Sequence, residues 1–259
     1  MTATSGTSHR QTKTIGIIVE ADHPVYSVVA DELRERGYDV RRFEPQRRIE
    51  RAEVDELGLL VNKRMCPESF HALLYADRTD VPTWNSFVSN VVFTARLTAL
   101  HALERVGFTV PDIYFEKPAG DYVAKSLFDM DTNDEPVIGG EGEFYQKLIR
   151  TQPVDYKHYA VAVGEELHTS VLKVKSKLFG EKEILGNAEA DKTIIDRIRQ
   201  LMKLTDSYGI NVDIVEGENE IYAVDVNPAP SFEGTGLEDE LTDSMELSLE
   251  KEKEVKGSY

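Results

Sequence analysis

The chain has 259 residues, enough for about two domains and a sizeable hydrophobic core. Its net charge of −17 and pI near 4.8 argue against nucleic acid as a ligand, because the nucleic-acid backbone binds to basic surfaces. The single cysteine, Cys66, excludes an internal disulfide, and no apolar run approaches the roughly 20 residues that span a bilayer, so no membrane partner is expected.

The first third of the chain has the pattern of an α/β unit. Three apolar segments are typical of strands, at residues 14–20, 38–43 and 57–62. A helix is expected at 24–36, after the first strand, because its apolar residues recur at helical spacing. Strand, helix and strand in this order predict a parallel sheet with right-handed crossovers. We expect this domain to cover residues 14–88, after a disordered 1–13. The glycine fingerprint of a dinucleotide-binding oxidoreductase is absent.

The middle of the chain predicts a small second unit over residues 89–150. A helix is expected at 91–106, closed by Gly107, and strands are expected at 121–127 and 144–149. The loop between these strands is acidic and carries glycine. Its carboxylates are Asp129, Asp131, Asp134, Glu135, Glu141 and Glu143.

A third unit is expected over residues 151–236. Its predicted elements are strands at 159–163 and 167–174, an amphipathic helix at 194–208 and a closing hairpin at 211–227. The remaining residues, 237–259, form an acidic tail that is either disordered or a marginal helix, with no chemistry assigned to it.

The closing hairpin is the most informative segment. Because side chains alternate along a strand, Asp213, Asp225 and Asn227 are predicted to share one face. The other face is expected to be apolar, with Val212, Ile214, Tyr222, Val224 and Val226. Three oxygen-bearing side chains on one face suit a hard cation such as Mg²⁺. An exposed polar face of an antiparallel sheet is the alternative interpretation.

A lysine in an apolar strand is a second candidate. Lys125 lies within the predicted strand 121–127, and lysine supplies a compact positive charge for phosphate groups. A solvated position on the strand is the alternative.

Taken in order, these segments resemble the ATP-grasp proteins of the glutathione-synthetase and ribosomal-protein glutamate-ligase type. The matching pieces are the first strand, residues 81–86, Ala95-Arg96-Leu97 before the turn at 107–111, Lys125, the strand at 144–149 and the closing hairpin. The resemblance implies an α/β fold in which the N-terminal parallel domain precedes two α+β subdomains that enclose a nucleotide cleft.

The resemblance also implies roles for individual residues. Adenine would lie against Gln146, Lys147 and Leu148, and Arg96 and Lys125 would approach the phosphates of ATP. Asp213, Asp225 and Asn227 would hold Mg²⁺, or Mn²⁺ in its place. The acidic substrate or the transferring phosphate would meet three further lysines: Lys157, Lys173 and Lys175.

Several residues depart from the pattern of that family. The glycine-rich phosphate loop is replaced by the short acidic loop, and Lys147 stands where glutamate is usual. Arg96 replaces a lysine and Asp225 replaces a glutamate. The leading hypothesis is an ATP- and Mg²⁺-dependent ligase that joins a small-molecule or peptide carboxylate to an amine through an acyl phosphate. The alternatives are a non-catalytic binding or regulatory protein and a small-molecule kinase. Many proteins of this kind self-associate, so a homo-oligomer is also considered.

The composition suggests where such a protein works. The polar, Ser- and Thr-rich start has no pattern of a secretory signal, which with the single cysteine favours the cytoplasm. Because acidic surfaces keep proteins soluble in strong salt, we hypothesise that this cytoplasm is halophilic. Stability that does not change between low salt and molar KCl would contradict the hypothesis.

Overall fold

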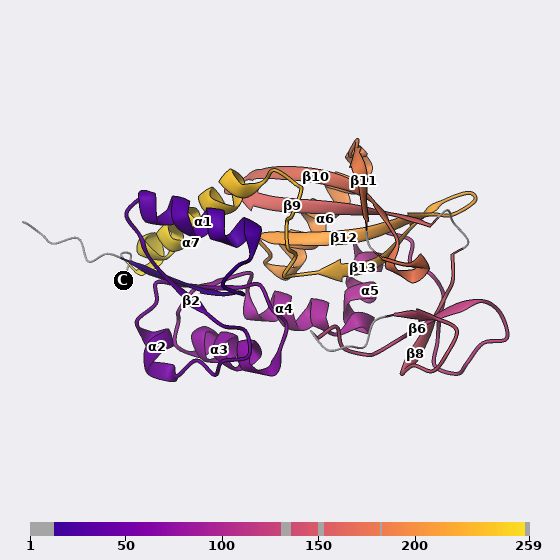
Figure 1. The fold of residues 1–259 in the computed structure, drawn as a ribbon, viewed down its shortest axis with the longest axis horizontal. Coiled ribbons are helices and arrows are strands. Elements are labelled where there is room, and N and C mark those ends of the chain that lie inside the picture. Colours follow the sequence, from indigo (N-terminus) through magenta and orange to yellow (C-terminus); the bar gives the residue numbers. More distant parts are fainter. Residues whose placement is uncertain (1–12, 131–135, 150–152, 182, 257–259) are drawn as a thin grey trace, which may run out of the picture.

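The computed structural model describes residues 13–130, 136–149, 153–181 and 183–256, which form three sheets with helices packed around them (Figure 1). The expectation for residues 1–12 and for Asp131, Asp134 and Glu135 therefore lies outside the described residues. None of the helices in the described ranges is both long and apolar enough to cross a membrane.

The N-terminal sheet is parallel, as predicted. Its strands are adjacent in the order β2 (Asp39–Phe43), β1 (Thr14–Ile18), β3 (Leu59–Asn62) and β4 (Thr83–Trp84). All five residues of β1 are buried, which explains their apolar sequence. Helix α1 (Pro24–Glu35) covers one face, while α2 (Arg51–Asp55) and α3 (Pro67–Arg78) cover the other (Figure 1). The sequence did not predict α2 or α3.

The helix predicted at 91–106 is interrupted, so the single-helix prediction is wrong. Helix α4 (Phe87–Thr94) ends and α5 (Arg96–Arg105) begins around Ala95, whose backbone is extended (φ −82°, ψ 98°). Ala95 pairs with Phe128 in an isolated antiparallel bridge, and the amide of Arg96 donates to the Leu127 carbonyl at 2.9 Å. Pairing with a distant segment therefore overrides local helix propensity. It makes Arg96 the first residue of α5.

The second sheet is small and antiparallel. Its order is β5 (Ile113–Tyr114), β8 (Phe144–Lys147), β6 (Tyr122–Lys125) and β7 (Val137–Ile138). Strands β6 and β8 confirm the two predicted strands, with shorter bounds. All four residues of β6 are buried, Lys125 among them.

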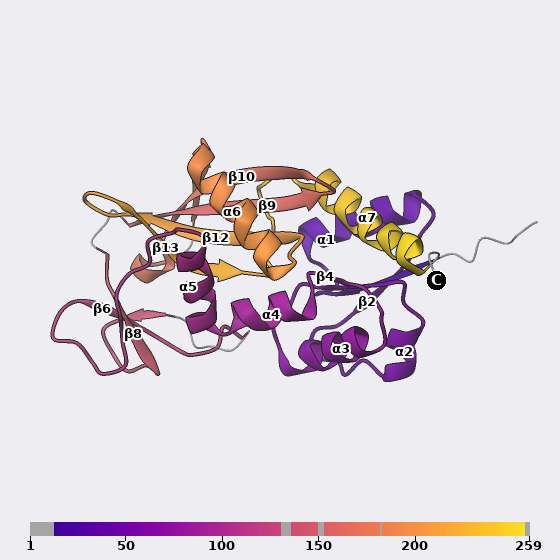
Figure 2. The same cartoon turned by 180° about the vertical axis from the view of Figure 1, so that it is seen from behind.

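The third sheet carries the predicted hairpin. Its antiparallel order is β11 (Glu183–Ala188), β10 (Glu166–Lys175), β9 (Val154–Val163), β12 (Gly209–Glu216) and β13 (Ile221–Asn227). Helices α5 and α6 (Lys192–Thr205) contribute to the core on one face of this sheet, and Figure 2 shows α6 lying over it. On the opposite face, residues at one end of the sheet pack into the N-terminal core, and residues at the other end line a cavity.

The acidic tail is neither disordered nor marginal over the residues that the structure describes. Helix α7 (Glu238–Lys256) lies beside α1 (Figures 1 and 2), and its apolar residues recur every four positions. These residues are buried in the N-terminal core: Leu241, Met245 and Leu249. The sequence interpretation missed the stripe because charged residues dominate the segment. Two of them, Asp243 and Glu246, pair with Arg36 at 2.6 and 2.8 Å.

Asn85 joins the N-terminal sheet to the hairpin. Its buried side chain, 1% exposed, donates to the carbonyls of Gly209 (2.6 Å) and Pro228 (2.7 Å). It also accepts from the amides of Tyr208 (2.5 Å) and Gly209 (2.9 Å). The close approach needs glycine, since a Cβ on Gly209 would lie 2.2 Å from the ring of Trp84. One amide side chain thus fixes where β12 starts and where β13 ends.

His158 makes stability dependent on pH. It lies on β9, and burial lowers its pKa from 6.5, while a backbone bond with Tyr156 opposes the shift. Below pH about 6.5 the unfolded chain binds a proton that the folded chain does not, so stability falls as the pH drops and is retained above this window. His158→Gln should flatten the decline between pH 7 and 5, by at most about 1.4 kcal/mol per pH unit.

The measurement is urea unfolding of both proteins at each pH. His101→Gln is the matched control, because His101 is exposed. An equal flattening in the control would contradict the role of His158.

Candidate functional site

A cavity of about 370 Å³ lies between the small sheet and the hairpin sheet. Its walls come from β6, β8, β9, β12 and β13, from the first residue of α5, and from the end of β10 with the short 3₁₀ helix η1 (Lys177–Phe179). Ten of the predicted site residues line it: Arg96, Lys125, Gln146, Lys147, Leu148, Lys157, Lys175, Asp213, Asp225 and Asn227. Residues from three separate parts of the chain therefore meet in one cavity.

The hairpin presents its acidic face to this cavity. Asp213 is directly opposite Asp225, and Asn211 is opposite Asn227, which confirms that Asp213, Asp225 and Asn227 share a face. An irregularity interrupts the pairing beyond Asp213, because Ile214 pairs with Ala223 and leaves Val224 between paired positions.

That irregularity corrects the predicted apolar face. Val224 lines the cavity together with Asp225, while Ala223 and Val226 enter the core. Tyr222, two residues before Val224, is likewise absent from that core. The prediction assumed unbroken alternation along the strand, and the extra residue at Val224 interrupts that alternation.

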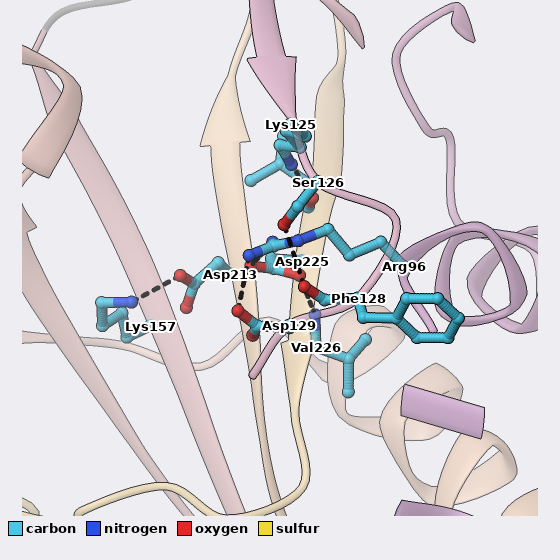
Figure 3. Close-up of polar contacts among 10 residues, drawn as sticks. Arg96, Lys125, Ser126, Phe128, Asp129, Lys157, Asp213, Asp225 and Val226 are labelled. Carbon is cyan, nitrogen blue, oxygen red and sulfur yellow. Dashed lines mark hydrogen bonds and ion pairs between the residues drawn. The ribbon is translucent and has the colours of Figure 1, made fainter. Parts of the chain in front are cut away.

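Arg96 is the centre of the ionic contacts. Its side chain is 4% exposed, and its guanidinium points between two carboxylates (Figure 3). Nη1 lies 3.1 Å from Asp225 Oδ2, and Nη2 lies 2.5 Å from Asp129 Oδ1. The break before α5 positions the side chain here, since it directs the first turn of the helix at the hairpin.

Lys125 is buried in the wall opposite the hairpin. The residue is 7% exposed, and Nζ donates to the carbonyl of Val224 at 2.9 Å. Burial lowers the pKa of Lys125, and the negative charge of Asp225 opposes this shift. The interrupted pairing of β13 supplies the carbonyl that holds the lysine.

Lys157 and Asp213 form the third ionic contact. Lys157 Nζ lies 2.5 Å from Asp213 Oδ2, and Figure 3 shows the two side chains pointing toward each other from neighbouring strands. Burial alone would lower the pKa of Lys157, but the charge of Asp213 and the hydrogen bond to it raise the pKa above its usual value.

Lys173 does not reach the cavity, which corrects its grouping with Lys157. Leu172 is the residue opposite Lys157 in the register of β9 and β10, so Lys173 faces the other side of the sheet. Its ammonium lies 6.0 Å from the ring centroid of Tyr156. Lys175, at the end of the strand, does line the cavity.

The sequence missed several lining residues, among them Asn211, Asp155 and Ser176. Asn211 alternates with Asp213 on β12, so the same face rule could have identified it. Asp155 alternates with Lys157, and burial raises the pKa of its carboxyl while a bond from Ser176 opposes the shift. No sequence pattern indicates Ser176.

Several polar atoms in the cavity wall have no partner among the described residues. They are buried and belong to four lining side chains: Arg96 Nε, Gln146 Nε2, Asn211 Nδ2 and Asp213 Oδ1. Buried polar groups are nearly always hydrogen-bonded, so atoms of this kind call for an explanation. A polar ligand in the cavity would provide one.

The donor set suits Mg²⁺ carried with phosphates. The described ranges contain no group of three or more His, Cys, Asp or Glu side chains placed to hold a metal. Mg²⁺ bound with a nucleotide commonly needs only one or two carboxylates. The facing Asp213 and Asp225 provide two, the unpartnered Oδ1 of Asp213 is a ready ligand, and Asn227 adds an amide oxygen beside them.

The cavity is also cationic in an acidic chain. Among the described residues that line it, six side chains are basic and four are carboxylates, whereas the whole chain carries a net charge of −17. A cavity lined mainly by charges of one sign raises the local concentration of ligands of the opposite sign. The cavity thus favours an anion over a cation.

The sequence matches no protein-family model and no curated protein. Solved structures do match its fold. The ATP-grasp ligase PsnB, complexed with a minimal precursor, aligns with a TM-score of 0.67 at 14% identity over 91% of this chain and 99% of its own. The RimK-domain ATP-grasp protein of Sphaerobacter thermophilus aligns at 0.66, with 13% identity over 90% and 97%.

A D-alanine–D-alanine ligase from Bacillus anthracis, complexed with ATP, also matches the fold. Its TM-score is 0.67 at 13% identity, over 94% of this chain and 99% of the ligase. The similarity spans the N-terminal parallel sheet and both antiparallel sheets, because nearly the whole of each chain is covered. The chain described here therefore has the ATP-grasp fold.

Proposed function

We propose that the cavity binds ATP with Mg²⁺ and that the protein is a carboxylate–amine ligase. One observation carries the proposal: in an acidic chain, a cavity with an excess of basic side chains faces two directly opposed carboxylates. Basic groups suit a triphosphate, and the paired carboxylates suit the cation that accompanies it. The fold, which is also that of a ligase complexed with ATP, supports the same choice.

Different groups of lining residues would contact the base, the phosphates and the metal. Gln146, Lys147 and Leu148 would contact the base, and Arg96 and Lys125 would contact the phosphates. The metal would be held by the carboxylates of the hairpin and an amide oxygen: Asp213, Asp225 and Asn227. Mg²⁺, or Mn²⁺ in its place, would neutralise negative charge on the phosphates.

The proposed reaction has two steps. A substrate carboxylate attacks the γ-phosphorus of ATP, releasing ADP and forming an acyl phosphate. An amine then attacks the acyl carbon and expels phosphate, which leaves an amide. Lys157, on β9 beside the hairpin, would bind the acidic substrate or the transferring phosphate.

The substrate is proposed at the level of a class. A solved structure with this fold contains a minimal precursor and another contains a precursor peptide, so a peptide carboxylate is one choice. The D-alanine–D-alanine ligase suggests a small amino acid as the other.

A nucleotide-binding protein without ligase activity is the second candidate. The observation that favours it is the pairing of the proposed metal ligands with basic groups, Asp225 with Arg96 and Asp213 with Lys157. A cation would have to compete with both pairs for the carboxylates. Release of ADP with any carboxylate and amine pair would exclude this candidate.

The binding step is tested by thermal unfolding with and without Mg-ATP. At a free concentration of 100 times its Kd, a ligand that binds only the folded state adds about 2.7 kcal/mol to the free energy of unfolding. We therefore expect a clear rise in Tm with Mg-ATP and a smaller rise with ATP and EDTA. No shift at millimolar Mg-ATP would remove the proposal.

A further inference from the structure

A carboxylate of the chain itself occupies one side of the most buried cation in the cavity. Arg96 is 4% exposed and contacts Asp225 through Nη1 and Asp129 through Nη2. The two carboxylates differ in how they are held. Asp225 is part of a paired strand, whereas Asp129 belongs to the segment that follows β6, and its side chain is 35% exposed.

Backbone hydrogen bonds hold Asp129 in this position. The amide of Asp129 donates to the Thr94 carbonyl at 2.7 Å, and the amide of Arg96 donates to the Leu127 carbonyl at 2.9 Å. The two segments thus bond in both directions across the break between α4 and α5. Glu143 supports the contact by accepting from the amide of Leu127 at 2.7 Å. Asp129 is therefore placed by structure and not by a chance side-chain conformation.

The position matters because carboxylates and phosphates compete for the same donors. A guanidinium presents a planar fork of N–H groups that binds either anion. Asp129 takes one edge of that fork, and Asp129, Arg96 and Lys125 all line the cavity. An anionic ligand that binds Arg96 from the cavity therefore competes with Asp129 for the guanidinium.

We propose that Asp129 is an autoinhibitory group that occupies Arg96 in place of a phosphate, so that a nucleotide must displace it. This inference rests on the proposed function, since it concerns the same cavity. It gives a role to the acidic segment that follows β6: the segment supplies a second anion for Arg96, in addition to Asp225, in the absence of a ligand. The contact lowers affinity for weakly charged anions and leaves the site to a polyphosphate.

The experiment compares Mg-ATP binding by Asp129→Asn and by the natural chain, using titration calorimetry. Asparagine loses the charge that strengthens the hydrogen bond from Arg96 to residue 129, so Mg-ATP should bind about ten-fold more tightly. Glu141→Gln is the matched control, because Glu141 lies in the same loop, is exposed and pairs with Lys117 at 2.8 Å. The control removes one negative charge without touching Arg96 and should leave the Kd within about two-fold.

Each outcome has one meaning. Tighter binding by Asp129→Asn alone supports the inference, and the gain should disappear when Arg96→Gln is added. Unchanged or weaker binding by Asp129→Asn, or an equal gain in Glu141→Gln, overturns it. If no protein in the series, the natural chain included, binds Mg-ATP while all show cooperative melting, the proposed function itself fails.

Discussion

Replacing Lys125 with methionine is expected to weaken Mg-ATP binding by about ten- to a hundred-fold, because hydrogen bonds to charged groups are worth about 1.5–3 kcal/mol. Methionine preserves the length of the side chain and removes its charge. The fold should survive, since the lost bond to the Val224 carbonyl is offset by removal of a desolvated ammonium group. We expect the free energy of unfolding to change by at most about 2 kcal/mol.

Calorimetric titration with Mg-ATP measures the effect, and urea unfolding checks the fold. Lys147→Met is the matched control. Lys147 also lines the cavity, but it is exposed and lies 3.6 Å from Asp112, so its loss should cost much less affinity. Equal losses in the two variants would show that only the overall charge of the cavity matters and would contradict a specific role for Lys125.

Asn85→Ala is expected to give the largest loss of stability, about 3–5 kcal/mol. The alanine leaves the amides of Tyr208 and Gly209 and the carbonyls of Gly209 and Pro228 without their partner. Each buried group left unsatisfied costs about 1–3 kcal/mol, and relaxation recovers part of that total. Nucleotide affinity should fall as well, because these bonds fix both ends of the hairpin.

Two further variants separate the bonds of Asn85. Asn85→Asp keeps an acceptor for the two amides but places a buried carboxylate oxygen against the two carbonyls, so its stability should be no higher than that of Asn85→Ala. Asn219→Ala, in the exposed turn of the hairpin, should change the free energy of unfolding by less than about 0.5 kcal/mol. A loss below about 1 kcal/mol in Asn85→Ala would contradict the proposed link.

The sequence predicted best what depends on local alternation. Asp213, Asp225 and Asn227 are on one face of a hairpin because strand geometry has a period of two residues, and no distant contact is needed to place them. The same rule, applied to β9 and β10 together, would have required the register between them. Without that register, Lys173 could not be separated from Lys157.

The errors arise where one part of the chain pairs with another. The interrupted helix before Arg96 depends on the bridge between Ala95 and Phe128, which nothing within residues 91–106 indicates. Val224 faces the cavity because the pairing of β13 is irregular. Helix α7 is well formed because its apolar residues pack into the core that contains α1 and β1. In each case a favourable long-range contact outweighs the local pattern.

The place of α7 in the core has a consequence for how the chain is made. Leu241, Met245 and Leu249 complete the same core as Ile15 and Ile17 of β1, which are synthesised more than two hundred residues earlier. The N-terminal sheet therefore cannot finish packing while it emerges from the ribosome, although many N-terminal domains do so. Its apolar surface stays exposed until nearly the whole chain has been translated, so a nascent chain that stalls before α7 should be a substrate for chaperones.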